Sequence, residues 1–232
     1  TKVLLQKLID KGYKFEVLTF GEQREVGQSN STIGKIVIYN ENNEDVTSNF
    51  EIECYPGKLK VVKELITFKF YDINKVYSGN VYKADETYLY ETVGLPNGAK
   101  ITFDVVGERI EVGTTSITLE NIVILSEAGE NITNNYSFEF IGQIIVRPLK
   151  ITIQTGSESK QYDETPLSNN EYWISMGRLV NGHNINCTIK TTIIEIGSVP
   201  NKVDSTVILD RLGNDVTNNY EINYLEGTLT IR

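Results

Sequence analysis

The sequence has few of the side chains on which most enzymes depend. Its 232 residues include one histidine, two cysteines, one methionine and one tryptophan. General acid–base catalysis and zinc binding draw mainly on histidine, cysteine and clustered carboxylates. We therefore expect no enzyme, no catalytic or cofactor-binding residues, and no metal or haem site.

Basic residues are also scarce relative to acidic ones. The chain has 22 Lys and Arg against 31 Asp and Glu, a net charge of −9. Nucleic acids and anionic membranes reward clustered Lys and Arg, so neither is expected as a partner. No apolar run approaches the roughly 18 residues of a membrane span, so a soluble segment without membrane contact is expected.

What the sequence does contain is an internal repeat. Residues 45–50 (DVTSNF) return as 131–136 (NITNNY) and as 215–220 (DVTNNY), at offsets of 86 and 84 residues. Glycines keep the same offsets in two further sets: Gly12, Gly98 and Gly182, and Gly27, Gly113 and Gly197. A period of about 85 residues predicts tandem domains, with the boundaries 1–64, 65–148 and 149–232.

The first of these repeats is predicted to be truncated. The second opens at residues 65–70 and the third at 149–153. The equivalent opening of the first would fall about twenty residues before Thr1, judged from the repeat period. We therefore expect the chain to be cut from a longer array.

Alternating apolar residues predict six or seven short strands in each repeat. The predicted fold class is all-β, with each repeat a small immunoglobulin-like β-sandwich. Residues 3–9 could form a helical turn, but their counterparts 89–95 favour a strand. A β-grasp-like module is the alternative if the stretches before Gly98 and Gly182 are helical.

Aligning the copies predicts which side chains face the core. Three sets of alternating positions are expected to be buried. They are Phe50, Ile52 and Cys54 with Tyr136, Phe138, Phe140, Tyr220, Ile222 and Tyr224; Phe15, Val17 and Thr19 with Ile101, Phe103, Val105, Ile185, Cys187 and Ile189; and Val37 and Tyr39 with Val123, Leu125, Val207 and Leu209.

The recurring Asp/Asn-x-Thr-x-Asn-aromatic string is interpreted as a structural turn. Asp and Asn side chains bond the backbone two residues further on, Thr does so more weakly, and Asn tolerates left-handed backbone. The aromatic residue is then expected to open a strand, with its ring in the core like a tyrosine corner. Asp210, Asn214 and Asp215 could suggest calcium, but their carboxylates shift between copies, so a hairpin turn is favoured.

Single residues capable of chemistry are expected to be structural. His183 lacks a reproducible partner constellation and is interpreted as a loop residue rather than a general base. Trp173 is predicted to lie in the core, with a sugar-stacking platform as the alternative. Cys54 and Cys187 occupy apolar positions and are predicted to be buried free thiols. Lys150 has no equivalent lysine in the second repeat, which argues against an internal isopeptide crosslink.

These motifs together resemble the MBG/YDG-type tandem repeats of Gram-positive bacterial cell-surface proteins. The third copy carries the resemblance best, although Glu164 stands where the family usually has glycine. The second copy has residues 77–79 (YSG) at that place. The matching stretches of the third copy are residues 162–167 (YDETPL), 179–183 (LVNGH), 196–198 (IGS), 213–220 (GNDVTNNY) and 227–231 (GTLTI).

The resemblance implies an extracellular, cell-wall-associated location and a role in an adhesin or its stalk. It carries no catalytic or cofactor residues. The leading hypothesis is a monomeric stalk or spacer segment, because the copies share core and turn positions but no exposed aromatic or charged set. The alternative is a binding module for a host glycan, mucin or protein, with residues that the sequence does not identify.

Overall fold

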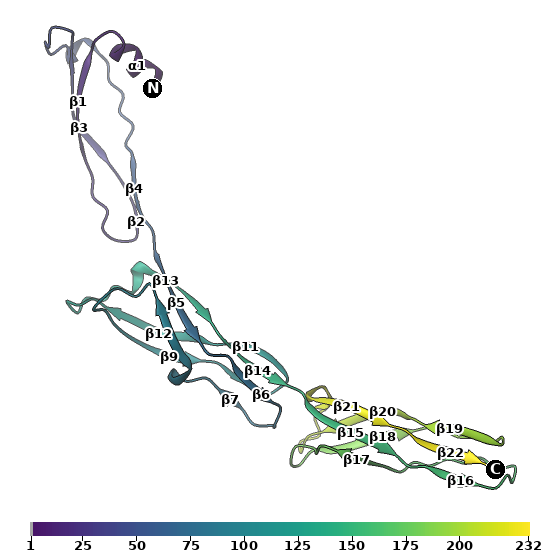
Figure 1. Cartoon of the computed structure of the whole chain (residues 1–232). Coiled ribbons are helices and arrows are strands. Elements are labelled where there is room, and N and C mark those ends of the chain that lie inside the picture. Colours follow the sequence, from purple (N-terminus) through teal and green to yellow (C-terminus); the bar gives the residue numbers. More distant parts are fainter. Residues whose placement is uncertain (1) are drawn as a thin grey trace. The chain divides into compact units, whose positions relative to one another are not determined.

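The structure, a computed structural model, describes residues 2–232, and its regular secondary structure consists almost entirely of short β-strands (Figure 1). The all-β prediction is therefore confirmed. Among the described residues no helix is long and apolar enough to cross a membrane.

The secondary structure falls into three consecutive stretches of chain. Residues 2–63 contain α1 (Lys2–Ile9), β1 (Lys14–Phe20), β2 (Gly27–Asn30), β3 (Thr32–Tyr39), the 3₁₀ turn η1 (Thr47–Asn49) and β4 (Lys58–Val61). Residues 64–147 contain β5 (Glu64–Phe70), β6 (Ile73–Val76), β7 (Tyr82–Lys83), η2 (Glu86–Tyr88), β8 (Leu89–Val93), β9 (Lys100–Val106), β10 (Glu108–Arg109), β11 (Gly113–Ser116), β12 (Thr118–Leu125), η3 (Thr133–Asn135), β13 (Tyr136–Ile141) and β14 (Gln143–Arg147). Residues 149–231 contain β15 (Leu149–Thr155), β16 (Glu158–Lys160), β17 (Tyr172–Met176), β18 (Asn184–Ile189), β19 (Gly197–Asn201), β20 (Val203–Leu209), η4 (Thr217–Asn219), β21 (Tyr220–Leu225) and β22 (Gly227–Ile231).

Three of the four sheets of residues 64–147 return in residues 149–231, while the pair β7-β10 corresponds to an isolated bridge between Leu167 and Ile193. The sheets β13-β5-β8, β11-β14-β6 and β12-β9 have the counterparts β21-β15-β17, β19-β22-β16 and β20-β18. In both sets the opening strand is central, because β5 pairs with β8 and β13, and β15 pairs with β17 and β21. Residues 2–63 contain only the two-stranded sheets β1-β3 and β2-β4.

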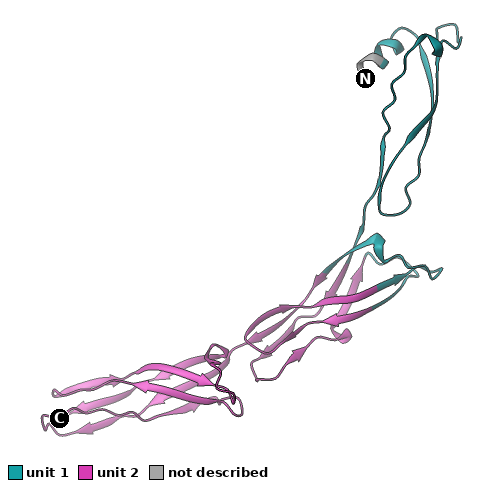
Figure 2. Ribbon diagram, turned by 180° about the vertical axis from the view of Figure 1, so that it is seen from behind, with its two compact units in different colours: residues 1–66, 94–102, 123–139 teal, residues 67–93, 103–122, 140–232 magenta. Residues whose placement is uncertain are grey.

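The chain divides into two compact units (Figure 2). Unit 1 comprises residues 1–66, 94–102 and 123–139, and its buried side chains include Val37, Ile38, Ile66, Ile124 and Tyr136. Unit 2 comprises residues 67–93, 103–122 and 140–232. Its buried side chains include Phe68, Ile117, Ile144, Val146, Ile151, Ile153, Ile208, Leu229 and Ile231.

Residues 2–9 form a helix, so the prediction of a strand there was wrong. The counterparts β8 and β17 are strands because each pairs with the opening strand, β5 or β15. Residues 2–63 contain no counterpart of the opening strands β5 and β15. Residues 2–9 are rich in Leu, Lys and Gln, which have good intrinsic helix propensity. The stretches before Gly98 and Gly182 are strands, so the condition set for a β-grasp arrangement is not met.

The same missing partner explains why residues 50–57 form no strand. Their counterpart β21 pairs in parallel with β15 along its whole length. Cys54 is exposed instead of buried, which corrects the prediction for this thiol. Four other residues of the first two predicted core sets are likewise exposed, namely Val17, Thr19, Ile52 and Tyr224.

The third predicted core set was wrong by one residue in two of the three copies. Val123 and Val207 are exposed, whereas their neighbours Ile124 and Ile208 are fully buried. In a strand, successive side chains point to opposite faces. Apolar runs such as residues 122–125 (IVIL) have no alternation, so the pattern could not choose the face.

The recurring turn forms the same hydrogen bonds at all three places. The side-chain Oδ1 of Asp45, Asn131 or Asp215 accepts the backbone N–H and the hydroxyl of the Thr two residues later. The Thr hydroxyl oxygen in turn accepts the backbone N–H of a buried isoleucine at 2.8–2.9 Å. These isoleucines are Ile38, Ile124 and Ile208. The structural interpretation of the motif is confirmed, and the bond to the isoleucine is an addition to it.

We predict that Thr133→Val destabilises the protein by about 1–3 kcal/mol, the cost of leaving a buried N–H without a partner. The variant keeps the shape of Thr133 but removes the acceptor for Ile124 N–H, 2.8 Å away. Urea unfolding followed by circular dichroism measures the loss. Thr133→Ser is the matched control, because it keeps the hydroxyl. Equal midpoints for the two variants would contradict the assigned role.

Candidate functional site

Three rings in unit 2 pack together, one from the residue after β6 and two from residues 149–232. Tyr77 follows β6, His183 precedes β18, and Tyr220 opens β21. Their ring centroids are 5.8–6.1 Å apart in all three pairs. Tyr77 is only 3% exposed. A tyrosine of residues 64–147 is therefore buried in a cluster that it forms with residues 149–231.

Hydrogen bonds fix the orientation of these rings. The Tyr220 hydroxyl accepts the backbone N–H of Val180 at 3.1 Å, and it lies 2.8 Å from Nδ1 of His183. The backbone N–H of Tyr77 donates to the Arg147 carbonyl at 2.8 Å. Since β14 ends at Arg147 and β15 begins at Leu149, this bond anchors Tyr77 beside the single residue that links the two strands.

A buried asparagine makes the second part of the contact. Asn219 donates through Nδ2 to Glu111 Oε2 and accepts the Val112 N–H at 2.8 Å through Oδ1. Its side chain is 3% exposed. Both halves of one amide are therefore used by residues more than 100 positions earlier in the chain. We call Tyr77, Glu111, Val112, His183, Asn219 and Tyr220 the joint cluster.

The loop that receives Asn219 is itself held in place by Arg109. The guanidinium donates to the Val112 carbonyl at 2.7 Å and to the Thr114 carbonyl at 3.0 Å. It also donates to the Thr115 hydroxyl at 3.0 Å. Because donors of one planar group bind three residues of the loop, Arg109 restrains the segment that carries Glu111 and Val112.

Burial dominates the electrostatics of the cluster. It raises the pKa of Tyr77 to about 12, and the negative charge of Glu111 adds to this shift. Burial also raises the pKa of Tyr220. Both phenols are therefore neutral hydrogen-bonding groups at physiological pH, as a packing role requires.

An open groove of about 940 Å³ adjoins the cluster. Arg178 and Arg211 supply its positive charge, and Asp210 is its carboxylate. The pKa of Asp210 is lowered, first by its hydrogen bond with the Asn214 side chain and then by backbone N–H groups. The remaining lining residues are Tyr77, Ser78, Gly79, Asn80, Leu149, Leu179, Val180, Asn181, His183 and Leu212.

The groove does not assemble a recognisable catalytic set. His183 faces the Tyr220 hydroxyl, and the Asp210 oxygens accept bonds from Leu212 and Asn214. Among residues 2–232, no group of three or more His, Cys, Asp and Glu is placed to hold a metal ion. Asp210 and Asp215 instead shape the hairpin turn that the sequence favoured, with Leu209 bridged to Asp215. What the arrangement can do is fix two stretches of chain to each other.

The other predicted residues lie apart from the cluster. Trp173 on β17 is 45% exposed, so the prediction of a core tryptophan was wrong. Cys187 is a half-buried free thiol whose pKa is raised by desolvation. Lys150 is exposed and pairs with Glu221 at 3.0 Å. His183 lies in a loop, as predicted.

Sequence reasoning missed Tyr77, Glu111 and Asn219 as partners. A signal for them exists in the repeat, because a Glu-Val/Ile-Gly triplet occurs at residues 25–27, 111–113 and 195–197. In each copy the triplet lies at the same distance along the chain from the recurrent asparagine of the turn. The pairing of the two could not be read from the sequence, since the triplet of one copy binds the asparagine of the next.

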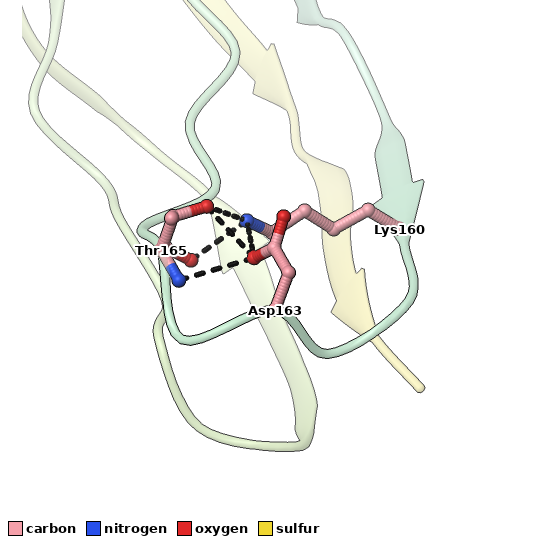
Figure 3. A network of polar contacts seen from close by, with 3 residues as sticks. All are labelled: Lys160, Asp163 and Thr165. Atoms are coloured by element: carbon pink, nitrogen blue, oxygen red, sulfur yellow. Dashed lines mark hydrogen bonds and ion pairs between the residues drawn. The ribbon is translucent and has the colours of Figure 1, made fainter.

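A polar network holds the loop that follows β16 (Figure 3). Lys160 Nζ donates to Asp163 Oδ1 at 2.6 Å and to the Thr165 carbonyl at 2.7 Å, and Asp163 Oδ1 also accepts the Thr165 N–H. The bond from Lys160, followed by those from Thr165, lowers the pKa of Asp163 to about 2. Asp85 forms the same Asp-x-Thr turn with Thr87.

Comparison with protein-family models, with curated proteins and with solved structures finds no match to this chain. The resemblance to MBG/YDG-type repeats therefore stays a prediction.

We predict that the Asp163 network makes stability depend on acid pH. Because the folded pKa lies below the ordinary aspartate value of 3.8, its contribution is present above about pH 4 and is lost as the pH falls toward 2. Asp163→Asn is expected to flatten the melting temperature against pH in that window. Lys160→Met should flatten it similarly, and a double variant should add little. An unchanged slope in both single variants would contradict the prediction.

Proposed function

We propose that this chain is a spacer segment of a bacterial cell-surface protein, built from tandem immunoglobulin-like β-sandwich repeats of about 85 residues. Its setting would be extracellular and associated with the cell wall, and the segment would act as a monomer that holds another part of the protein in position. The support comes from the sequence repeat and from the strand pairings that return in residues 64–147 and 149–231.

The joint cluster is the observation that carries this proposal. Successive repeats joined by a flexible linker would behave as independent beads. Here one residue, Pro148, separates β14 from β15. Asn219 and Tyr220 are buried against residues of the preceding stretch. A spacer needs resistance to bending at each connection, and a buried amide bonded through both its nitrogen and its oxygen, beside a packed tyrosine, supplies it.

We predict that Asn219→Ala loosens the joint. Spin labels at Glu120→Cys on β12 and Ser205→Cys on β20, in a Cys54→Ser, Cys187→Val background, report the spacing across it. Both positions are exposed and lie in unit 2. The unaltered joint is expected to give one narrow distance distribution. Asn219→Ala is expected to broaden it, because Glu111 and the Val112 N–H lose their partner.

Asn135→Ala is the matched control for this experiment. It removes the equivalent amide of the preceding turn, in unit 1. It should leave the distribution unchanged. A broad distribution in the unaltered joint, or equal broadening by both variants, would remove the main support for a spacer.

A second candidate function, glycan binding, is favoured by the exposure of Trp173. Its cross-strand neighbour on β15 is Gln154, which in turn lies opposite Leu225 on β21. Residues directly opposite in a sheet share one face. An exposed indole beside an amide and an apolar side chain is a surface on which a sugar ring can stack.

If glycan binding is the function, Trp173→Ala should abolish binding on a glycan array. Met176→Ala is the control, since Met176 is an exposed apolar residue on the same strand. No bound glycan with the unaltered chain at high concentration would exclude this candidate, and equal losses in both variants would exclude Trp173 as its platform.

A further inference from the structure

We infer that the chain carries a second, uncovered docking site at Tyr162, Glu195 and Ile196, and that its occupant is the turn at residues 45–50 of a second copy of this chain. The inference rests on the proposed function, because it takes the joint cluster as the pattern for how one repeat meets another. We call these three residues the open site.

The backbone of the open site matches the site already occupied by Asn219 and Tyr220. The Tyr162 N–H donates to the Arg232 carbonyl at 2.8 Å, as the Tyr77 N–H does to Arg147. Two residues after each tyrosine the backbone is left-handed, with φ of 74° at Gly79 and 63° at Glu164.

The Glu-Val/Ile-Gly triplets also occupy matching places. Gly113 opens β11 opposite Val146, and Gly197 opens β19 opposite Ile231. The two residues before each glycine therefore extend from equivalent strand ends. They are Glu111 and Val112 at the occupied site, and Glu195 and Ile196 at the open site. The open site thus has a tyrosine, a carboxylate and a backbone N–H at the corresponding places in the chain.

What differs is the covering. Tyr77 is 3% exposed because His183 and Tyr220 pack on it, whereas Tyr162 is 45% exposed. Ile196 is 67% exposed, while its counterpart Val112 is half-buried beside Asn219. An apolar side chain and a phenol ring exposed next to a carboxylate fit a partner with both an aromatic ring and an amide.

The turn at residues 45–50 is such a partner. It forms the hydrogen bonds of the turn that carries Asn219, with Asp45 and Thr47 in the places of Asp215 and Thr217. Tyr13 and Phe50 make an edge-to-face pair with centroids 5.8 Å apart, matching the 6.0 Å of His183 and Tyr220.

Asn49 holds the position of Asn219, yet its side chain is exposed. In the proposed contact Asn49 Nδ2 donates to the Glu195 carboxylate and Oδ1 accepts the Ile196 N–H. The two surfaces differ from each other, so the contact is heterologous and adds chains one after another.

Two residues oppose this docking. Ile193 stands where Arg109 holds the loop of the occupied site. A Cβ at Gly79 would lie 2.9 Å from Val180 Cγ1, so the occupied site needs a glycine there. The open site has Glu164 instead. We therefore expect a weak contact, with the chain monomeric when dilute and associating where copies are crowded. Glu164→Gly should strengthen it.

Cysteine crosslinking tests the contact on the full chain. In a Cys54→Ser, Cys187→Val background, chains with Ile194→Cys are mixed with chains carrying either Ser48→Cys or Gln28→Cys and treated with a short bifunctional thiol reagent. Ile194 and Ser48 are exposed neighbours of Glu195 and Asn49, so both contact residues are kept, and Gln28 is an exposed control position on β2 outside the turn. The proposal requires a crosslinked dimer about tenfold more abundant with Ser48→Cys than with Gln28→Cys.

Concentration-dependent sedimentation supplies the second readout. The unaltered chain should associate at high concentration, Asn49→Ala should reduce this, and Glu164→Gly should increase it. Equal crosslinking at positions 28 and 48, or sedimentation unaffected by either variant, would overturn the inference. Such a result would leave the spacer proposal standing if Asn219→Ala still broadens the distance distribution within the chain.

Discussion

The pairing of one opening strand on both of its edges is the constraint on which the rest of the structure depends. β15 lies between the antiparallel β17 and the parallel β21. Most of residues 149–231 lie between β15 and β21 in the sequence. Such a non-local pair brings the two ends of 149–231 together, and forming it requires closing a long loop of chain. Residues 2–63 show what happens without it. The segment equivalent to β17 is the helix α1, and residues 50–57 form no strand. Local propensity decides the conformation wherever the long-range partner is missing.

The joint cluster is a consequence of the same pairing. Tyr220 is placed by its register opposite Leu149, the first residue of β15. Tyr77 is placed by the parallel pair of β6 and β14, which brings its N–H to the Arg147 carbonyl. The two tyrosines therefore approach each other because Arg147 and Leu149 are separated by a single proline. Asn219 is bonded to Glu111 and Val112 because η4 lies just before Tyr220. No separate docking element is needed, because the ends of the sheets are already the surface that makes the contact.

The sequence predicted best what local chemistry decides. The Asp/Asn-x-Thr turn follows from hydrogen bonds within three residues, and it is formed at all three places where the full recurring string occurs. Faces were harder to assign. In residues 122–125 every side chain is apolar, so the pattern does not show which of them face the core. Trp173 was misassigned because its counterpart Leu89 is half-buried on β8. The alignment of copies assumes that equivalent residues have the same surroundings, but Trp173 is exposed on β17.

The joint escaped prediction for a reason that is general to tandem repeats. Asn49, Asn135 and Asn219 share one position in the alignment, yet they are exposed, half-buried and buried respectively. Within a repeat the same residue has the same neighbours, so an alignment treats the three as equivalent. At the edge of a repeat the neighbours belong to another copy, and they change with the copy that is present. A search for exposed residues common to all copies therefore overlooks these positions, since a residue that binds the adjoining repeat is covered wherever its partner is present. In such a chain, identical residues with different burial mark the contacts between successive repeats.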